Sequence, residues 1–121
     1  MAKKVVAEYG GVIPTDEEAL KGLPGVGQKT AHVFLIEFLQ QNYMAVDTHV
    51  FRTSHRLGLA DEKSAVKTEA QLSVAYGDNL AILHQAMVLF GRYICKAKNP
   101  LCNDKCFLRE FCQTNANFKP A

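Results

Sequence analysis

The stretch that decides the fold is Leu23-Pro24-Gly25-Val26-Gly27-Gln28-Lys29-Thr30-Ala31. Pro24 fixes one backbone angle, while Gly25 and Gly27 permit turn conformations and a close approach of other molecules. Helical patterns lie on both sides, so we predict a helix, a tight glycine hairpin and a second helix. Backbone N–H groups at the start of that second helix would favour an anion such as a phosphodiester. An ordinary turn between two helices explains the same residues, so both interpretations stay open at this point.

The residues on either side of the hairpin carry start and stop signals for helices. Thr15 and Glu18 form a capping box for a short helix over about 16–21. Gly22 is expected to end that helix in a left-handed conformation. The second helix is expected over about 27–40, with one apolar face at a spacing of 3.6 residues. The members of that face are Ala31, Phe34, Leu35, Phe38 and Leu39.

Helical periodicity continues through the rest of the chain. We expect helices from Asp47 or Thr48 to about Leu57, over about 64–76 and over about 80–94. The inward side chains expected for the second of these are Val66, Ala70 and Val74. The last helix carries two apolar stripes, which are Leu80, Leu83, Met87, Phe90 and Ile94, and Ile82, Ala86 and Leu89. No strand pattern is visible, so the predicted class is all-α.

Length and composition are those of a modest globular domain. The chain has 121 residues, 48% of them hydrophobic. This is enough to form a core and argues against a disordered chain. The formal net charge is only +2, but the segment from Arg92 onward is locally basic, as a phosphate-facing or a solvated surface would be. No apolar run approaches the length of a membrane helix or of a signal peptide core. We therefore expect a cytoplasmic protein with no membrane partner.

A lysine and an aspartate stand at the starts of two expected helices. Lys29 lies in the first turn after the hairpin, and Asp47 lies in Ala45-Val46-Asp47-Thr48-His49-Val50-Phe51-Arg52. A neutral amine can attack the anomeric carbon of a nucleotide, expel the base and form a Schiff base. A carboxylate can stabilise positive charge on the sugar or deprotonate the nucleophile. A solvated surface lysine and a simple helix cap also explain these two residues.

The histidines carry no assigned role. His32 and His49 follow Lys29 and Asp47 by a few positions and are expected near any site formed there. His55 and His84 are expected to be surface or packing residues.

Four cysteines gather near the C-terminal end, in the pattern Cys95-x6-Cys102-x3-Cys106-x5-Cys112. Thiolates at such spacing can bind a [4Fe–4S] cluster or a tetrahedral Zn²⁺, and the spacing alone leaves both open. Basic residues between the cysteines suit a loop that lies against a DNA backbone. Such a metal group would act as a structural clamp and not as a redox centre.

In combination, these segments resemble the endonuclease III family of DNA glycosylase/AP lyases, within the helix-hairpin-helix-GPD superfamily. The resemblance rests on Leu23–Ala31, Val46–Arg52, Gly91-Arg92-Tyr93-x-Cys95 and the cysteine pattern, in that order, and covers about 9–112. It implies a bifunctional enzyme of base-excision repair that acts on double-stranded DNA. Such an enzyme removes oxidised pyrimidines and cleaves abasic sites by β-elimination through a lysine Schiff base.

The resemblance also implies roles for single residues. Lys29 matches the Schiff-base lysine and Asp47 the catalytic aspartate, and monofunctional relatives usually lack such a lysine. The residues implied to bind DNA are Leu23, Gly25, Val26, Gly27, Lys29 and Thr30. The implied [4Fe–4S] ligands are Cys95, Cys102, Cys106 and Cys112, which moves the preference from zinc to the cluster.

The chain departs from the family pattern in three ways. The gap between Cys102 and Cys106 is one residue longer than in the family, and Phe90 stands where relatives often have histidine. Family members also carry a further N-terminal part that supplies helices and part of the base pocket. We therefore expect the C-terminal part of the helix-hairpin-helix glycosylase fold, as a fragment, a split-gene product or a decayed copy.

The expected organisation has two parts. A partial helical domain over 1–91 would contain the helix-hairpin-helix at about 16–40, and 92–121 would form the iron–sulfur loop and tail. A second chain that completes the helical domain is an expected partner, and the bacterial nucleoid is an expected place of action. The alternative function is a truncated, catalytically impaired DNA-binding module that holds iron–sulfur or zinc.

Overall fold

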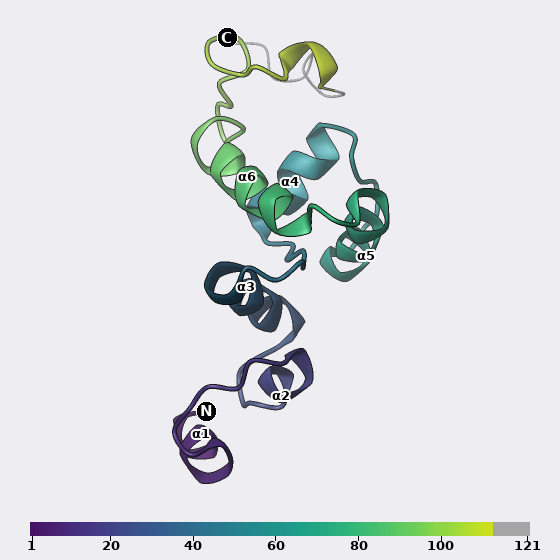
Figure 1. Ribbon diagram of the computed structural model, residues 1–121. Helices are drawn as coiled ribbons and strands as arrows, with labels where there is room; N and C mark the ends of the chain where they lie inside the picture. The colour runs from purple at the N-terminus through teal and green to yellow at the C-terminus, as the bar shows by residue number, and fades with distance from the viewer. Residues whose placement is uncertain (113–121) are drawn as a thin grey trace.

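The structure is a computed structural model, which describes residues 1–112 of the chain. These residues form helices and loops without any strand, so the all-α prediction is confirmed. The elements are α1 (Ala2–Tyr9), α2 (Glu17–Lys21), α3 (Gln28–Leu39), α4 (Thr48–Arg56), α5 (Ala65–Tyr76), α6 (Leu80–Tyr93) and the 3₁₀ helix η1 (Arg109–Phe111) (Figure 1). None of the helices within residues 1–112 has the length and apolarity that crossing a bilayer requires.

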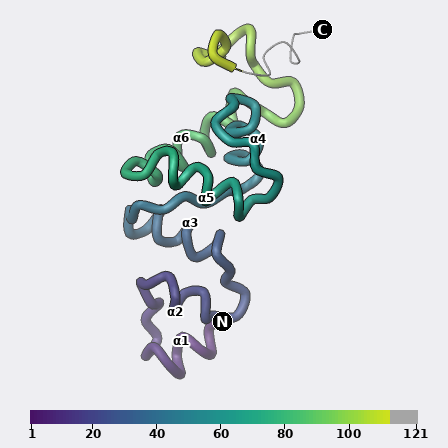
Figure 2. The backbone as a smooth tube through the Cα atoms, turned by 90° about the vertical axis from the view of Figure 1, so that its right-hand side faces the viewer, coloured from purple at the N-terminus to yellow at the C-terminus, as the bar shows by residue number. Residues whose placement is uncertain are grey.

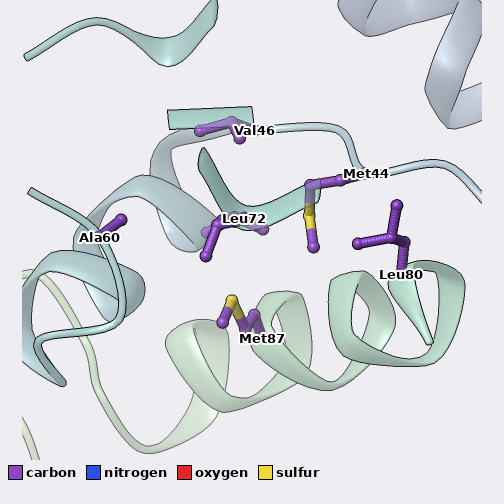
Figure 3. Packing of buried hydrophobic residues seen from close by; sticks show 7 residues of the cluster. Met44, Val46, Ala60, Leu72, Leu80 and Met87 are labelled. Atoms are coloured by element: carbon purple, nitrogen blue, oxygen red, sulfur yellow. The ribbon is translucent and has the colours of Figure 1, made fainter. Parts of the chain in front are cut away.

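The helices follow one another along an elongated molecule. Both α1 and α2 lie at one end, α3 comes next, α4 to α6 form a group beyond it, and the cysteine-bearing segment lies at the far end (Figures 1 and 2). One buried cluster joins α1 to α3 and comprises Val5, Leu20, Leu23, Ala31 and Leu35. The other joins the following segment to α4, α5 and α6, and comprises Met44, Val46, Val50, Ala60, Leu72, Leu80 and Met87 (Figure 3). The core is thus divided between two groups of helices.

Two details of the α2 boundaries differ from the sequence-based expectation. The cap is Asp16, whose carboxylate accepts a hydrogen bond from the Ala19 N–H at 3.0 Å, and not Thr15. Gly22 is right-handed, with φ −74°, so the predicted left-handed stop is wrong. The chain continues to turn through Leu23, whose N–H donates to the Leu20 carbonyl at 3.0 Å, and it reverses at Gly25, where φ is +84°.

The predicted inward faces are correct for part of α3 and wrong for α5. Ala31 and Leu35 are fully buried, but Phe38 is 74% exposed. In α5, Val66 and Val74 are exposed. The side chains that α5 buries are Thr68, Glu69 and Leu72. Thr68 donates to the Glu62 carbonyl and Glu69 meets polar groups of α3, so hydrogen bonds and not apolar spacing set the rotation of this helix.

Helix α6 packs closely on α4 through a glycine. It buries Leu80, His84, Met87 and Gly91, while the second predicted stripe, Ile82, Ala86 and Leu89, is exposed. A Cβ atom at Gly91 would lie 3.0 Å from His49 Cβ and 3.0 Å from Thr53 Cγ2. Both neighbours belong to α4, so the two helices approach as closely as a residue without a side chain allows.

We expect Gly91→Ala to destabilise the fold despite the higher helix propensity of alanine. The added methyl group must push α6 away from α4, and such overpacking costs about 1–3 kcal/mol against a propensity gain of at most about 1 kcal/mol. Urea unfolding of the variant measures the loss. Ala75→Leu, at an exposed position of α5, is the control and should leave the unfolding free energy nearly unchanged. A Gly91→Ala protein as stable as the wild type would contradict the close packing.

Candidate active-site cleft and cysteine pocket

The hairpin between α2 and α3 presents backbone to solvent. The Val26 N–H donates to the Leu23 carbonyl at 3.1 Å, which closes a tight turn with Gly25 at positive φ. Gly27 is the N-cap of α3 and offers no side chain to the first-turn N–H groups. No atom lies within 4 Å of the place a Cβ would take at Gly25 or Gly27. The start of α3 is therefore open to an anion from outside.

The hairpin residues predicted to bind DNA differ in exposure. Gly25, Gly27, Lys29 and Thr30 are exposed, and Val26 is half-buried. The Leu23 side chain is only 3% exposed and packs in the N-terminal cluster. Leu23 therefore holds the hairpin in place, and any contact it makes with a ligand involves its backbone.

The structure brings Lys29 and Asp47 to the same cleft. This cleft has a volume of about 700 Å³ and lies between α3, the start of α4 and α6. Its lining is Lys29, Val33, Glu37, Asp47, His84, Gln85, Val88, Leu89 and Arg92. Lys29 is exposed within it and Asp47 is half-buried. The Lys29 amine and the Asp47 carboxylate thus line the same cleft. The sequence pattern alone did not require this arrangement.

Asp47 is held by its own helix. It is the N-cap of α4, and its Oδ1 accepts a hydrogen bond from the Val50 N–H at 2.8 Å. This contact confirms that Asp47 is a helix cap. A cap bond fixes the carboxylate at the cleft, so the capping role and a chemical role are compatible in the same residue.

Two buried histidines contact the backbone segment that leads to Asp47. His32 of α3 places Nδ1 3.3 Å from the Met44 carbonyl, and His84 of α6 places Nδ1 2.8 Å from the Ala45 carbonyl. We expected His84 to be a surface or packing residue; it is buried, and its position in the cleft lining was not predicted. Its place on the same helical stripe as Leu80 and Met87 was the available signal.

His32 lies at the centre of a polar cluster that joins three helices. Its Nδ1 contacts the Glu69 carboxylate of α5, and its Nε2 lies 3.0 Å from Glu17 Oε1 of α2. Gln28 donates to the same Glu69 carboxylate, and the Tyr43 ring stacks on the imidazole at 4.5 Å. The closeness of the His32 imidazole lowers the pKa of Glu17, and burial raises the pKa of Tyr43. The cluster ties the hairpin helices to α5.

The lowered pKa of Glu17 gives a stability prediction. A carboxylate whose folded pKa is depressed stabilises the protein above its ordinary value of 4.5, and this contribution is lost as the pH falls through the folded pKa. We expect Glu17→Gln to lower the melting temperature at pH 6, and the difference from wild type to shrink as the pH falls below about 4.5. Thermal unfolding between pH 3 and 7 measures it. Glu18→Gln, an exposed neighbour, is the matched control; an equal effect in both variants would contradict the His32 contact.

The four predicted metal ligands line one small pocket. Cys95 is buried, and Cys102, Cys106 and Cys112 are half-buried. The rest of the lining consists of Arg56, Leu57, Phe90, Ile94 and Arg109. None of the four forms a disulfide. Within residues 1–112, no three His, Cys, Asp or Glu side chains are grouped so as to hold a single metal ion.

The chemistry of this pocket suits a cationic group. Burial raises the pKa of the Cys102 thiol, and the charges of Cys106, Cys95 and Cys112 raise it further, while Arg56 acts in the opposite direction. Several thiolates in one pocket repel one another, and a bound metal group would relieve that repulsion. By their chemistry the four thiols therefore suit a thiolate-bound cluster, whereas the described side chains are not grouped to hold a single ion.

Two arginines of α4 connect the cysteine pocket to the helix that begins at Asp47. Arg52 donates to the Gly91 carbonyl at 2.8 Å and to the Cys95 carbonyl at 3.0 Å. Arg56 donates to the Lys96 carbonyl at 2.7 Å and lies 3.4 Å from Cys95 Sγ. These bonds hold the end of α6 and the first cysteine against α4. The cleft and the cysteine pocket are thus attached to the two ends of one helix.

Comparison with known proteins shows what the chain is similar to. Residues 8–36 match the helix-hairpin-helix motif family. Endonuclease III of Thermotoga maritima is 41% identical over 114 residues, which cover 93% of this chain and 53% of the relative. Endonuclease III of Rickettsia conorii is 42% identical over 121 residues, which cover 98% of this chain and 57% of the relative.

Solved structures agree with the sequence comparison. A non-covalent endonuclease III–DNA complex superposes with a TM-score of 0.87 at 37% identity, and covers 95% of this chain and 54% of that one. A trapped endonuclease III–DNA covalent intermediate gives the same TM-score and identity. The fold and hairpin define an all-helical protein of the helix-hairpin-helix class. More specifically, the chain is similar to endonuclease III in sequence and structure, and it spans about half the length of the curated relatives it matches.

Proposed function

We propose that the chain serves base-excision DNA repair as a DNA glycosylase/AP lyase, with Lys29 as the nucleophile and Asp47 as the catalytic carboxylate. The observation that supports this proposal is the cleft that Lys29 and Asp47 both line, with Lys29 two residues after the open backbone of Gly27. One of the similar structures named above is that of a trapped endonuclease III–DNA covalent intermediate. The proposed substrates are double-stranded DNA with oxidised pyrimidines or with abasic sites.

The proposed chemistry assigns each step to a residue of the cleft. The neutral amine of Lys29 forms a bond to C1′ of the sugar, the bond to the base breaks, and the base leaves with the electron pair and a proton. Asp47 stabilises the positive charge that develops on the sugar. Ring opening leaves a Schiff base between the lysine nitrogen and C1′. Loss of a C2′ proton then breaks the C3′–O bond, and the 3′ phosphate leaves with the electron pair.

The hairpin is the proposed contact with the DNA backbone. Exposed N–H groups at the start of α3 can bind a phosphate, and the bare backbone at Gly25 and Gly27 lets it come close. Val26 and Thr30 flank this position. Contacts of this kind hold a duplex without reading its sequence, so binding should be salt-dependent and indifferent to sequence. The nucleoid would then be the place of action in the cell.

The four cysteines are the proposed ligands of a [4Fe–4S] cluster, with Zn²⁺ as the alternative occupant. The shared pocket, its thiol donors and the adjacent arginines support a thiolate-bound group. The group would stabilise the basic loop at the end of α6 in the orientation that a DNA backbone requires. Its own chemistry takes no part in the steps above.

Borohydride trapping on abasic duplex DNA tests the proposal. Reduction of a Schiff base gives a stable covalent adduct, so the wild-type chain should become crosslinked to abasic DNA but not to intact DNA. Salt-dependent binding without any adduct would instead identify a DNA-binding module without turnover. If the chain neither binds DNA nor forms an adduct, both functions are overturned.

We also propose that a second chain covers apolar side chains that the described part leaves in solvent. Ile82 is 71% exposed, Leu89 53% and Tyr93 62%, and all three lie on one face of α6. A stripe of this kind favours association in water. If that chain is a second copy of this one, sedimentation equilibrium should show a species larger than the monomer, and Ile82→Ser, which lies outside the cleft lining, should weaken it. A monomer at all concentrations would contradict a second copy as the partner.

A further inference from the structure

The segment that delivers Asp47 to the cleft has no regular secondary structure. Between the end of α3 and the start of α4, residues 40–47 belong to no helix. Met44, Ala45 and Val46 are nonetheless buried, at 1%, 0% and 5% exposure. Buried carbonyl groups need hydrogen-bond donors. The donors that reach this segment therefore decide where Asp47 lies relative to Lys29.

One such donor is the imidazole of His84, which comes from α6. The ring is 3% exposed, and its Nδ1 lies 2.8 Å from the Ala45 carbonyl. A carbonyl oxygen can only accept a hydrogen bond, so Nδ1 must carry a proton. Ala45 precedes Asp47 by two residues in a segment without regular secondary structure. The bond thus acts on the backbone immediately before the carboxylate.

The same ring also belongs to the cleft. His84 is part of the lining together with Lys29 and Asp47, and its Nε2 lies 4.0 Å from Glu37 Oε1 of α3. Its two nitrogens therefore face different parts of the site: one faces the segment that carries Asp47, the other faces the helix that carries Lys29. An aliphatic side chain could fill the same place but could not donate to the Ala45 carbonyl.

We propose that His84 is a positioning residue, which sets the place of the Asp47 carboxylate through the hydrogen bond from Nδ1 to the Ala45 carbonyl. The effect of this hydrogen bond on catalysis rests on the function proposed above. Its effect on the position of Asp47 does not depend on that function. Truncating the donor leaves a buried carbonyl without a partner, and the segment then shifts to find water.

The Val50 amide reports the position of Asp47 without any reaction. Val50 is the third residue of α4, where an amide has no partner within the helix, and its N–H donates to Asp47 Oδ1 at 2.8 Å. The Phe51 amide, one residue later, bonds to the backbone carbonyl of Asp47 at 2.9 Å and so reports the helix alone. Hydrogen exchange at the two amides separates movement of the carboxylate from fraying of α4.

The experiment compares His84→Phe with His84→Asn, whose side-chain amide can still donate near the place of Nδ1. We expect His84→Phe to raise exchange at Val50 about 10-fold with little change at Phe51, and His84→Asn to restore most of the protection. Unchanged exchange at Val50, or an equal rise at both amides in both variants, would overturn the proposal. An equal rise would mean that His84 merely supports the fold.

The rate of borohydride trapping gives the catalytic readout. A carboxylate displaced by about 1 Å can cost about 10²-fold in rate, so His84→Phe should slow adduct formation by about 10- to 100-fold at unchanged DNA affinity. His84→Asn should remain within about 3-fold of wild type. If the wild-type chain forms no adduct, the proposed lyase function fails, and the exchange data still decide whether His84 positions Asp47. A His84→Phe variant with the wild-type rate would overturn the catalytic part.

Discussion

Lys29→Ala is expected to abolish the covalent adduct between the chain and abasic DNA. The proposed reaction needs a nitrogen that bonds to C1′, and within the cleft Lys29 supplies an amine beside the Asp47 carboxylate. Removing a covalent nucleophile leaves only the contribution of binding, so we expect a loss of at least about 10³-fold in the trapping rate. The measurement is the amount of crosslinked product against time on a denaturing gel.

The control for this experiment is a second lysine that lies away from the cleft. Lys67 is exposed on α5 and is not part of the cleft lining, so Lys67→Ala removes the same charge without touching the site. It should retain the wild-type rate. DNA affinity should fall only slightly in Lys29→Ala, because the hairpin backbone remains intact. An adduct that persists in Lys29→Ala would show that another amine forms the Schiff base.

Cys102→Ser is expected to remove the metal group. Cys102 lies in the pocket with the other three cysteines, and serine is a poor ligand for iron. We expect iron content to fall from about four atoms per chain to near zero, with loss of the brown colour of a [4Fe–4S] protein. Iron and labile sulfide assays, together with the visible absorption spectrum, measure the change.

The neighbouring residue offers a matched control for the cysteine. Asn103 is exposed beside Cys102, so Asn103→Ser makes a small change in the same loop without removing a thiol. It should keep the full iron content. A wild-type protein that is colourless and carries zinc would establish the alternative occupant. Full iron content in Cys102→Ser would remove Cys102 from the ligand set.

The prediction from sequence was strongest for features that depend on local bonds. The order of the helices, the start of α4 at Asp47 and the end of α3 near Gln40 agree with the structure to within a residue or two. Caps, turns and helical hydrogen bonds join residues a few positions apart, so the chain near each boundary determines it. The misplaced cap of α2 is a small error of the same kind, since Thr15 and Asp16 are adjacent and both can cap.

The least accurate prediction from sequence concerned the face that each helix turns toward the core. Apolar spacing placed Val66 and Val74 of α5 inward, but both are exposed, and Glu69 is buried in their place. The reason is the polar cluster around His32, because a buried carboxylate with hydrogen-bonding partners is tolerated where an isolated one is not. Such partners are distant in sequence, so the periodicity of one helix cannot reveal them.

By itself, the sequence determined the all-helical class, the positions of α2 to α6, the glycine hairpin and the residue types that could do chemistry. Tertiary structure alone decided that Lys29 and Asp47 share a cleft, that the four cysteines line one pocket, and that His84 contacts the segment leading to Asp47. The physical reason is the range of the interactions. Helices form from hydrogen bonds between near neighbours, whereas a site forms only when packing brings separate helices together, as at the glycine contact between α4 and α6.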